Sequence, residues 1–225
     1  MLWQTLSPAW QACVAEAWAA YGADTVPIGA VIVDGAGRLL VRARNHIYDA
    51  LSADASSAAP LQGTPLAHAE MNALERLGRL PADPKTCTLL TSLEPCPMCL
   101  GAIRINALPR VEYAARDPVG GSACLADASA FMRRRPVALT GPGSAELEAV
   151  LVAWHMAFAL KHHWWWPSLA GEIAAAADWA GAEPGDYGRG LRLGEALFRA
   201  ETLDKFSAER RPAAEVVDEL AALAA

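Results

Sequence analysis

The sequence predicts an α/β fold followed by a helical C-terminal region. Short β-prone runs alternate with longer runs of helical spacing over most of the chain. With 225 residues the chain is long enough for one ample core plus an appendage, and 53% hydrophobic against 20% charged residues is typical of a globular protein. The expected strands are residues 30–33, 39–44, 87–93, 110–115 and 137–139, and the expected helices among them start near Ser7, Ala69, Met98, Cys124 and Ser144.

The first elements carry clear local signals. Ser7 followed by Pro8 predicts a helix start, because a hydroxyl cap followed by proline is favoured there. Asp34-Gly35-Ala36-Gly37 predicts a hairpin turn between the first two strands. The second strand ends at Asn45, and residues 49–65 then form a long loop rich in Ser, Ala and Pro. A loop of this length is usually functional or disordered, so it either covers a pocket or is a floppy insertion.

The strongest chemical signal is Cys96-Pro97-Met98-Cys99, at the point where a β-prone run meets a helix. Two cysteines in a first helical turn can aim both sulfurs at one point, and the helix N-terminus favours thiolates. Zinc binds such a pair but needs a third protein ligand. Read alone, the pair also fits a redox dithiol or half of a structural zinc site.

His68-Ala69-Glu70 supplies the missing ligand. The tripeptide opens a helix over residues 69–80, so both polar side chains can reach a metal beyond the end of the helix axis. We therefore expect one zinc ion per chain, held by His68, Cys96 and Cys99 with water as the fourth ligand. Glu70 stands beside that water as a base and is not a ligand. A redox pair would leave the His-x-Glu motif unexplained, and a structural site would need a fourth Cys or His.

The chain downstream of this motif continues the alternation. Arg116-Asp117 follows the strand at residues 110–115. Arg133-Arg134-Arg135 ends a helix over residues 124–135, where a cationic triplet compensates the helix dipole more often than it contacts phosphate. Ser144 caps a helix that runs to about Lys161.

Residues 162–225 form a second region. They open with two histidines and three tryptophans, His162 to Trp166, which we interpret as a packing clamp, a dimer contact or a pocket wall rather than a metal site. Helical spacing begins at Leu169, is interrupted over residues 182–190 and ends with a helix over residues 212–224. We expect residues 1–161 to form one domain and residues 162–225 to be a helical extension packed on it.

Together these stretches resemble the cytidine and deoxycytidylate deaminase superfamily, most of all its guanine deaminase and bacterial tRNA adenosine deaminase branch. The H-x-E…P-C-x-x-C pattern is that of zinc deaminases. The matching residues are 26–31, 44–45, 67–70, 93–102 and 113–117. The resemblance implies a three-layer α/β/α fold with a five-stranded mixed sheet, and a homodimer. It also implies that Asn45, Pro27, Ala67 and Asp117 contact the substrate.

The resemblance and the motif imply hydrolytic deamination of an amino-substituted nucleobase or nucleoside, of purine type (guanine, guanosine, adenosine) or cytosine type. A tRNA-editing adenosine deaminase shares every catalytic residue and is the alternative; a non-catalytic zinc scaffold is favoured less. A net charge of −6 and a pI of about 5.4 argue against nucleic acid as a partner. Because the chain has no signal peptide or membrane span, we expect a cytoplasmic enzyme, with Cys13, Cys87 and Cys124 as buried free thiols.

Overall fold

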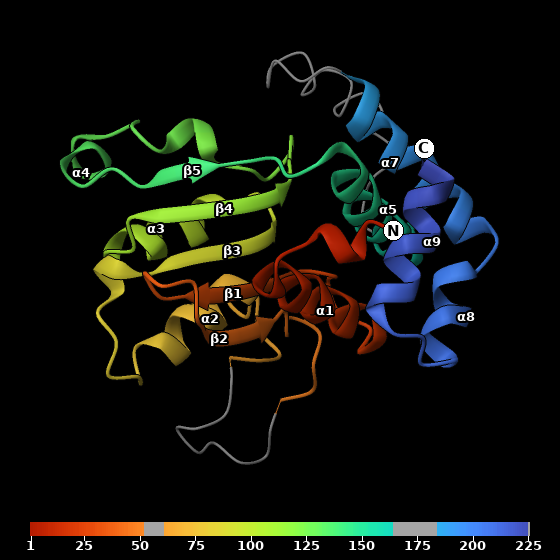
Figure 1. Cartoon of the computed structure of the whole chain (residues 1–225), viewed down its shortest axis with the longest axis horizontal. Coiled ribbons are helices and arrows are strands. Elements are labelled where there is room, and N and C mark those ends of the chain that lie inside the picture. The colour runs from red at the N-terminus through yellow and green to blue at the C-terminus, as the bar shows by residue number, and fades with distance from the viewer. Residues whose placement is uncertain (52–60, 164–183, 225) are drawn as a thin grey trace.

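The computed structural model describes residues 1–51, 61–163 and 184–224. At its centre lies a mixed sheet of five strands in the order β2-β1-β3-β4-β5 (Figure 1). β1 pairs antiparallel with β2 and β3, whereas β3, β4 and β5 are parallel. The predicted five-stranded mixed sheet is confirmed. The strands are β1 (Gly29–Val33), β2 (Leu39–Arg44), β3 (Thr88–Leu93), β4 (Arg110–Ala115) and β5 (Ala138–Thr140).

Helices cover both faces of this sheet. In Figure 1, α1 lies in front of the sheet, and α2 and α3 lie behind it. The indole of Trp154 in α5 packs on that of Trp18 in α1, with ring centroids 5.1 Å apart. The helices are η1 (Trp3–Thr5), α1 (Pro8–Gly22), α2 (Ala69–Leu77), η2 (Pro84–Thr86), α3 (Pro97–Ile105), η3 (Ala123–Leu125), α4 (Ala130–Arg134), α5 (Ala145–Lys161), α7 (Pro184–Arg199), α8 (Thr202–Ala208) and α9 (Ala213–Ala224).

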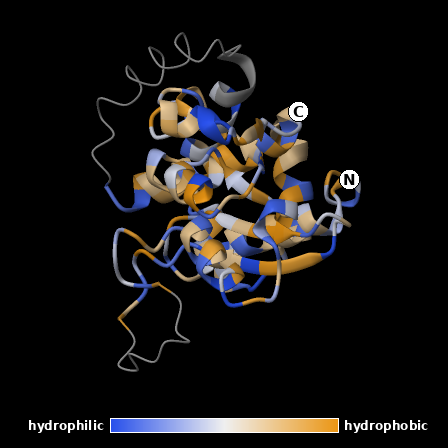
Figure 2. Ribbon diagram, turned by 90° about the vertical axis from the view of Figure 1, so that its left-hand side faces the viewer, coloured by the Kyte–Doolittle hydropathy of each residue, from blue (hydrophilic) through white to orange (hydrophobic). Residues whose placement is uncertain are grey.

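The central strands are buried on both faces, as strands covered by helices on each side must be. All five residues of β1 and all six of β3 are buried. Hydrophobic residues accordingly concentrate along these strands and the inner sides of the helices (Figure 2). Gly29 allows α1 to approach closely, because a Cβ at this position would lie 2.1 Å from the carbonyl oxygen of Cys13.

The C-terminal helices pack against the rest of the core. The indole N–H of Trp18 donates a hydrogen bond of 2.8 Å to the carbonyl of Arg211, and the backbone N–H of Trp3 donates one of 2.8 Å to Asp218. The side chains of Leu203 and Leu220 are almost completely buried. The two termini therefore lie near each other beside α9 (Figure 1).

The predicted interruption over residues 182–190 is wrong from Pro184 onward, since α7 begins there and continues without a break. Gly190, at the end of the predicted interruption, and Gly194, one turn later, allow α7 to pack closely on α5. A Cβ at Gly190 would lie 2.7 Å from Cβ of Val152, and one at Gly194 would lie 2.7 Å from the carbonyl oxygen of Ala153. Their role is close helix packing, which local propensity cannot distinguish from a helix break.

Two further predictions need correction. The helix expected over residues 124–135 is replaced by η3 and the short α4, because the hydroxyl of Ser129 caps a new helix start by accepting from the N–H of Met132. Cys124 is exposed, not buried, whereas Cys13 and Cys87 are buried.

Some predicted features fall on undescribed parts of the chain. Most of the loop over residues 49–65, and the tryptophans at 164–166, lie outside the described residues. Among the described helices, none has the length and apolar content that a membrane crossing requires.

Candidate active site

Three predicted side chains converge between the first turns of α2 and α3. Nδ1 of His68 lies 3.5 Å from Sγ of Cys99 and 3.8 Å from Sγ of Cys96. In a tetrahedral zinc site, ligand atoms bonded at the usual Zn–N and Zn–S lengths are about 3.6 Å apart. Among the described residues, these three form the one His, Cys or carboxylate cluster compact enough to hold a metal ion. The spacing and the donor atoms therefore fit zinc.

The sequence places these donors by local means. His68 and Cys96 are the N-cap residues of α2 and α3, both in extended backbone conformation, and neither side chain caps its own helix. Pro97 occupies the first position of α3, where its missing N–H costs nothing. A hydrogen bond from the Cys99 thiol, opposed by burial, lowers the pKa of Cys96 to about 4. The pocket thus favours a thiolate, which is the form that binds zinc.

Glu70 lies beside the three donors in the first turn of α2. Its side chain is buried, and its Oε1 accepts a hydrogen bond of 3.2 Å from the hydroxyl of Thr91 in β3. Burial raises the pKa of Glu70 above the ordinary carboxylate range. A carboxyl group that is held in place and binds protons more readily than usual is suited to general acid–base chemistry.

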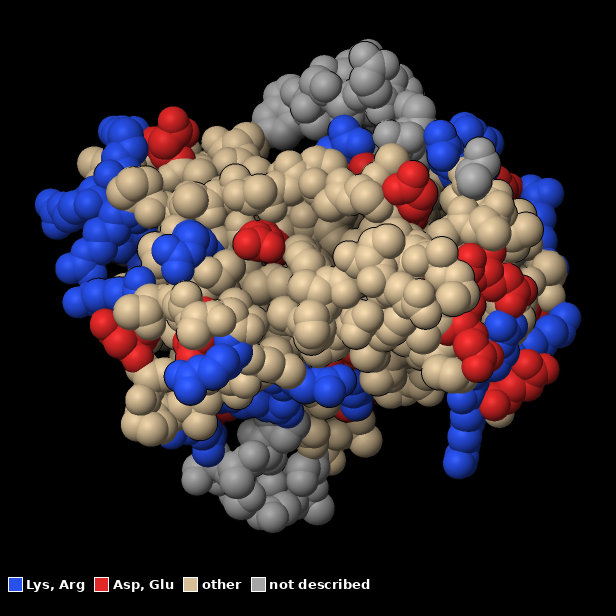
Figure 3. All heavy atoms as spheres, viewed as in Figure 1, with Lys and Arg blue, Asp and Glu red and all other residues tan. Residues whose placement is uncertain are grey.

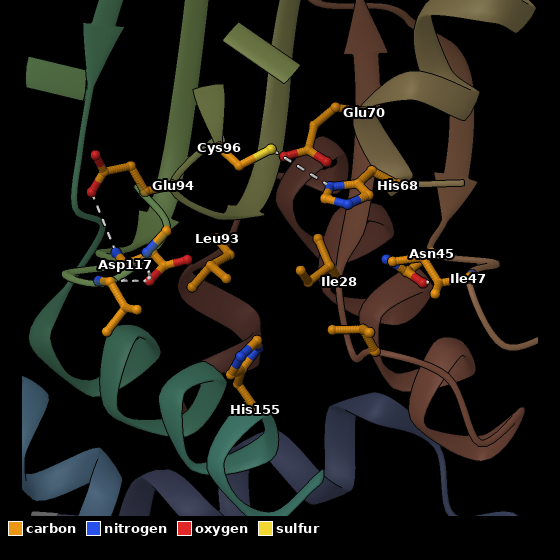
Figure 4. A pocket seen from close by; sticks show the side chains of 13 residues that line it. Ile28, Asn45, Ile47, His68, Glu70, Leu93, Glu94, Cys96, Asp117 and His155 are labelled. Atoms are coloured by element: carbon orange, nitrogen blue, oxygen red, sulfur yellow. Dashed lines mark hydrogen bonds between the residues drawn. The ribbon is translucent and has the colours of Figure 1, made fainter. Parts of the chain in front are cut away.

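These groups open into a cavity of about 270 Å³. Figure 4 shows His68, Cys96 and Glu70 on one side of it, with apolar side chains such as Leu93 and Ile28 between them and the opposite side. Among the described residues, no Lys or Arg lines it. The lining residues are Val26, Ile28, Asn45, Ile47, His68, Glu70, Leu93, Glu94, Cys96, Asp117, Val119, Gly120 and His155.

Asn45, predicted to contact substrate, lines this cavity. Its Oδ1 accepts hydrogen bonds from the hydroxyl of Thr25 (3.0 Å) and the N–H of Ile47 (2.9 Å), which fix the amide plane. Its Nδ2 is buried and has no partner among the described residues, and Figure 4 shows it on the cavity side of the amide. A buried donor without a partner is costly, so this N–H is suited to a ligand.

Asp117, the second polar residue predicted to contact substrate, also lines the cavity. Its Oδ1 accepts from the backbone N–H groups of Val119 (3.1 Å) and Gly120 (2.8 Å). The carboxylate of Glu94 holds the same turn by accepting from the N–H groups of Asp117 (3.3 Å) and Ala123 (2.8 Å). The turn is therefore anchored from two sides.

Pro27 and Ala67, the other two predicted substrate contacts, do not line the cavity. Both are buried and lie next in sequence to lining residues.

Sequence reasoning missed Glu94 and His155, which also line the cavity. His155 comes from α5, far along the chain from both zinc-binding motifs. A signal for it was available: between Glu148 and Lys161, His155 is the one titratable side chain in an otherwise apolar helix. Burying a polar side chain is costly unless it is hydrogen-bonded, so a single titratable residue in an apolar helix is a candidate for a site.

Comparison with known proteins agrees with this geometry. A family model described as the cytidine and deoxycytidylate deaminase zinc-binding region matches residues 4–115. The chain is 34% identical over 102 residues to a cytosine deaminase of Candida albicans, covering 45% of this chain and 60% of the relative. It is 38% identical over 93 residues to the guanine deaminase of Bacillus subtilis, covering 40% of this chain and 50% of the relative.

A structure from a study of A-to-I editing by tRNA:A34 deaminases is 30% identical, with a TM-score of 0.42, and the match covers 60% of this chain and 88% of that one. This chain covers 60% of the length of the cytosine deaminase and 50% of the length of the guanine deaminase. The matched region contains His68, Cys96 and Cys99. By this match and these identities, the chain belongs to the cytidine and deoxycytidylate deaminase superfamily.

Proposed function

We propose that this protein is a zinc-dependent aminohydrolase that deaminates an amino-substituted nucleobase or nucleoside. The observation that carries the proposal is the convergence of His68, Cys96 and Cys99 beside the buried carboxyl of Glu70, at one side of the cavity. Its similarity to a cytosine deaminase and a guanine deaminase supports the same chemistry. The non-catalytic scaffold is disfavoured because Glu70 would then be a buried carboxyl without a task.

One zinc ion per chain would be held by the imidazole of His68 and the two thiolates, which leaves the fourth position for water. When bound, zinc supplies a Lewis acid that activates this water for attack. The remaining chemistry belongs to Glu70.

Glu70 moves the protons of the reaction. Its carboxylate takes a proton from the attacking water and delivers it to the ring nitrogen next to the amino-bearing carbon. The C–O bond forms at that carbon as the first proton leaves the water, and the proton of the resulting hydroxyl group then passes through Glu70 to the amine. The C–N bond then breaks, ammonia leaves and a carbonyl remains, so that one water is consumed for each ammonia released. The hydroxyl of Thr91 keeps the carboxylate in position throughout.

Substrate orientation would come from Asn45 and Asp117. The free Nδ2 donor of Asn45 pairs with an acceptor on the base, and the carboxylate of Asp117 accepts from an N–H of the base. Pro27 and Ala67 would contribute by backbone or by supporting the wall.

Charge distribution favours a small free substrate over tRNA. The cavity walls carry the acidic residues Glu94 and Asp117, and among the described lining residues no cation is present to bind phosphate. Basic side chains gather at the end of the molecule where α4 lies, whereas acidic and basic side chains alternate over the C-terminal helices at the other end (Figure 3). A polynucleotide would need cations along its path to the site.

Assembly and location extend the same proposal. Ile105 is 72% exposed at the end of α3 and Phe131 is 53% exposed in α4, and Arg104 of α3 joins the two helices by donating to the carbonyl of Phe131. This apolar pair supports a homodimer that buries it.

We place the enzyme in the cytoplasm, where its free thiols stay reduced. Residues 1–161 would form the deaminase domain, with residues 162–225 as its packed extension.

The test is ammonia release from a panel of free bases, nucleosides and unmodified tRNA, measured at low and at physiological salt. We expect release from at least one free base or nucleoside, with little salt dependence because no phosphate contact is involved. Activity on tRNA alone, falling steeply as salt rises, would favour the editing alternative. Absence of release from every substrate by zinc-loaded protein would contradict both.

A further inference from the structure

His155 stands in the wall of the cavity on the side opposite His68 (Figure 4). It is carried by α5, whose neighbouring positions Trp154 and Phe158 are completely buried in the core. The backbone of α5 is therefore held rigidly by packing, and the imidazole has a defined place in the wall. Residues on rigid elements are the ones that can read a ligand's shape and polarity.

The surroundings of His155 favour its neutral form. Burial lowers the pKa of this imidazole, and the nearby carboxylate of Asp117 opposes the effect without cancelling it. A neutral imidazole offers one N–H donor and one nitrogen acceptor. Whichever nitrogen faces the cavity can therefore meet a complementary polar group on the edge of a flat heterocycle.

The polar groups of the cavity lie around an apolar middle. Figure 4 shows His68 and Glu70 on one side of the cavity and His155 on the opposite side. Asn45 and Asp117 occupy the two remaining sides. The apolar side chains of Leu93 and Ile28 lie between these polar groups. A base whose reacting carbon sits at Glu70 would rest on these apolar side chains. Only a base that spans the whole cavity would also meet His155.

The cavity volume indicates which bases can do so. An apolar cavity of about 150 Å³ accommodates one benzene-sized ring. The cavity here is about 270 Å³, nearly twice that volume. It therefore has room for two fused rings and would leave space unfilled around a single ring.

From this arrangement we propose that the substrate is a two-ring, purine-type base or its nucleoside, and that His155 is a specificity-determining residue that hydrogen-bonds the ring farther from zinc. The inference deepens the proposed deaminase function and rests on it. A single-ring base such as cytosine, bound at Asn45 and Glu70, would not reach His155.

The experiment compares kcat/KM of the wild type, His155→Ala and His155→Gln on guanine, adenine, guanosine and cytosine. We expect His155→Ala to lower kcat/KM for the two-ring substrate about tenfold or more, through KM, and to change cytosine turnover less than about threefold. His155→Gln keeps one donor and one acceptor and should recover part of the loss. The matched control is His163→Asn, which removes an exposed imidazole just after α5 at a positive φ of 48° that Asn tolerates.

The inference is wrong if His155→Ala, folded and zinc-loaded, matches the wild type on the two-ring substrate. It is equally wrong if the loss is the same for cytosine.

A binding measurement separates this inference from the deaminase proposal. Unsubstituted purine has no amino group to lose, so calorimetric titration of zinc-loaded protein with purine does not depend on turnover. We expect purine to bind the wild type about tenfold more tightly than His155→Ala, and its binding to shift the ¹⁵N resonances of the His155 imidazole. If no base is deaminated but purine binding shows this difference, the deaminase proposal fails and the His155 contact stands. If purine fails to bind, or binds both proteins equally, the His155 contact is wrong.

Discussion

The carboxylate of Glu148 in α5 binds the guanidinium of Arg116 at the end of β4, accepting from Nε at 2.8 Å and from Nη2 at 2.7 Å. The same carboxylate accepts a hydrogen bond of 3.0 Å from the backbone N–H of Arg116. The Glu148 side chain is 1% exposed and the Arg116 side chain is 19% exposed, so the carboxylate is buried and the guanidinium is partly accessible. The pair fixes the direction in which the chain leaves β4, one residue before Asp117 enters the cavity wall.

Replacing Glu148 by Ala should strongly destabilise the protein. The change removes the carboxylate to which Arg116 donates two side-chain hydrogen bonds and one backbone hydrogen bond, and the loss of such charge-assisted hydrogen bonds costs about 1.5–3 kcal/mol of unfolding free energy. Urea denaturation measures the change. Glu146→Ala is the control, because Glu146 lies in the same first turn of α5 but is exposed, and it should cost less than about 1 kcal/mol. Equal losses in the two variants would mean that Arg116 finds its stabilisation elsewhere.

Zinc content should depend on the thiol of Cys96. Cys96→Ala leaves His68 and Cys99 as two donors, which is fewer than a stable zinc site requires. We expect about one zinc per chain in the wild type and a large loss in the variant, measured by atomic emission on protein purified without chelator. Cys124→Ala, which removes an exposed thiol, should keep the wild-type content. Undiminished zinc in Cys96→Ala would remove Cys96 from the ligand set.

Glu70→Gln should separate metal binding from chemistry. The amide has nearly the shape of the carboxyl group but cannot carry a proton between water and substrate, so we expect the rate of ammonia release to fall by about 10²–10⁴. Zinc content should remain near that of the wild type, because Glu70 is not among the three converging donors. Glu75→Gln, farther along α2, serves as the control and should leave the rate unchanged. A nearly active Glu70→Gln would assign the proton transfer to another group.

Asp49 should contribute stability that depends on pH. Burial opposes its ionisation, but hydrogen bonds from Arg44 (2.7 Å) and His46 (2.7 Å) outweigh burial and lower the pKa of Asp49. A lowered pKa in the folded state means that the stabilisation is complete above the unfolded value of about 3.9 and is lost as pH falls through the folded value. The difference in Tm between the wild type and Asp49→Asn should therefore be large at neutral pH and should decrease as the pH falls below the folded-state pKa of Asp49.

Thermal unfolding between about pH 3 and pH 7 measures this difference. Asp127→Asn, at an exposed position, should show a small and constant difference from the wild type. If the difference in Tm between the wild type and Asp49→Asn does not change with pH, the charge of the Asp49 carboxylate is not the source of the stability difference.

The C-terminal extension should unfold together with the sheet. Leu220 in α9 is fully buried against the core, and its truncation to Ala should cost about 2–5 kcal/mol of unfolding free energy. Leu223, three residues later in the same helix, is 63% exposed, and Leu223→Ala should cost less than about 0.5 kcal/mol. We expect a single transition by both tryptophan fluorescence and circular dichroism. Two separate transitions, with only one shifted in Leu220→Ala, would indicate an independently folding extension.

The sequence by itself determined the features whose causes are local. The cap at Ser7, the hairpin at residues 34–37 and the strand at residues 110–115 lie where their patterns predicted. The donors of the metal cluster were also predictable. Each motif occupies one helix start, so its own spacing fixes the direction of its side chains, and the structure brings the two motifs together.

Tertiary structure alone decided the features that join distant segments. Gly190 lies in the stretch that was predicted to interrupt the helix, but α7 packs on α5 there, and the absent Cβ atoms of Gly190 and Gly194 permit the contact. His155 becomes a cavity residue only because α5 packs across the end of the sheet, and Glu148 reaches Arg116 for the same reason. Such contacts depend on the crossing of elements, which is set by the total packing of the core and not by any local pattern.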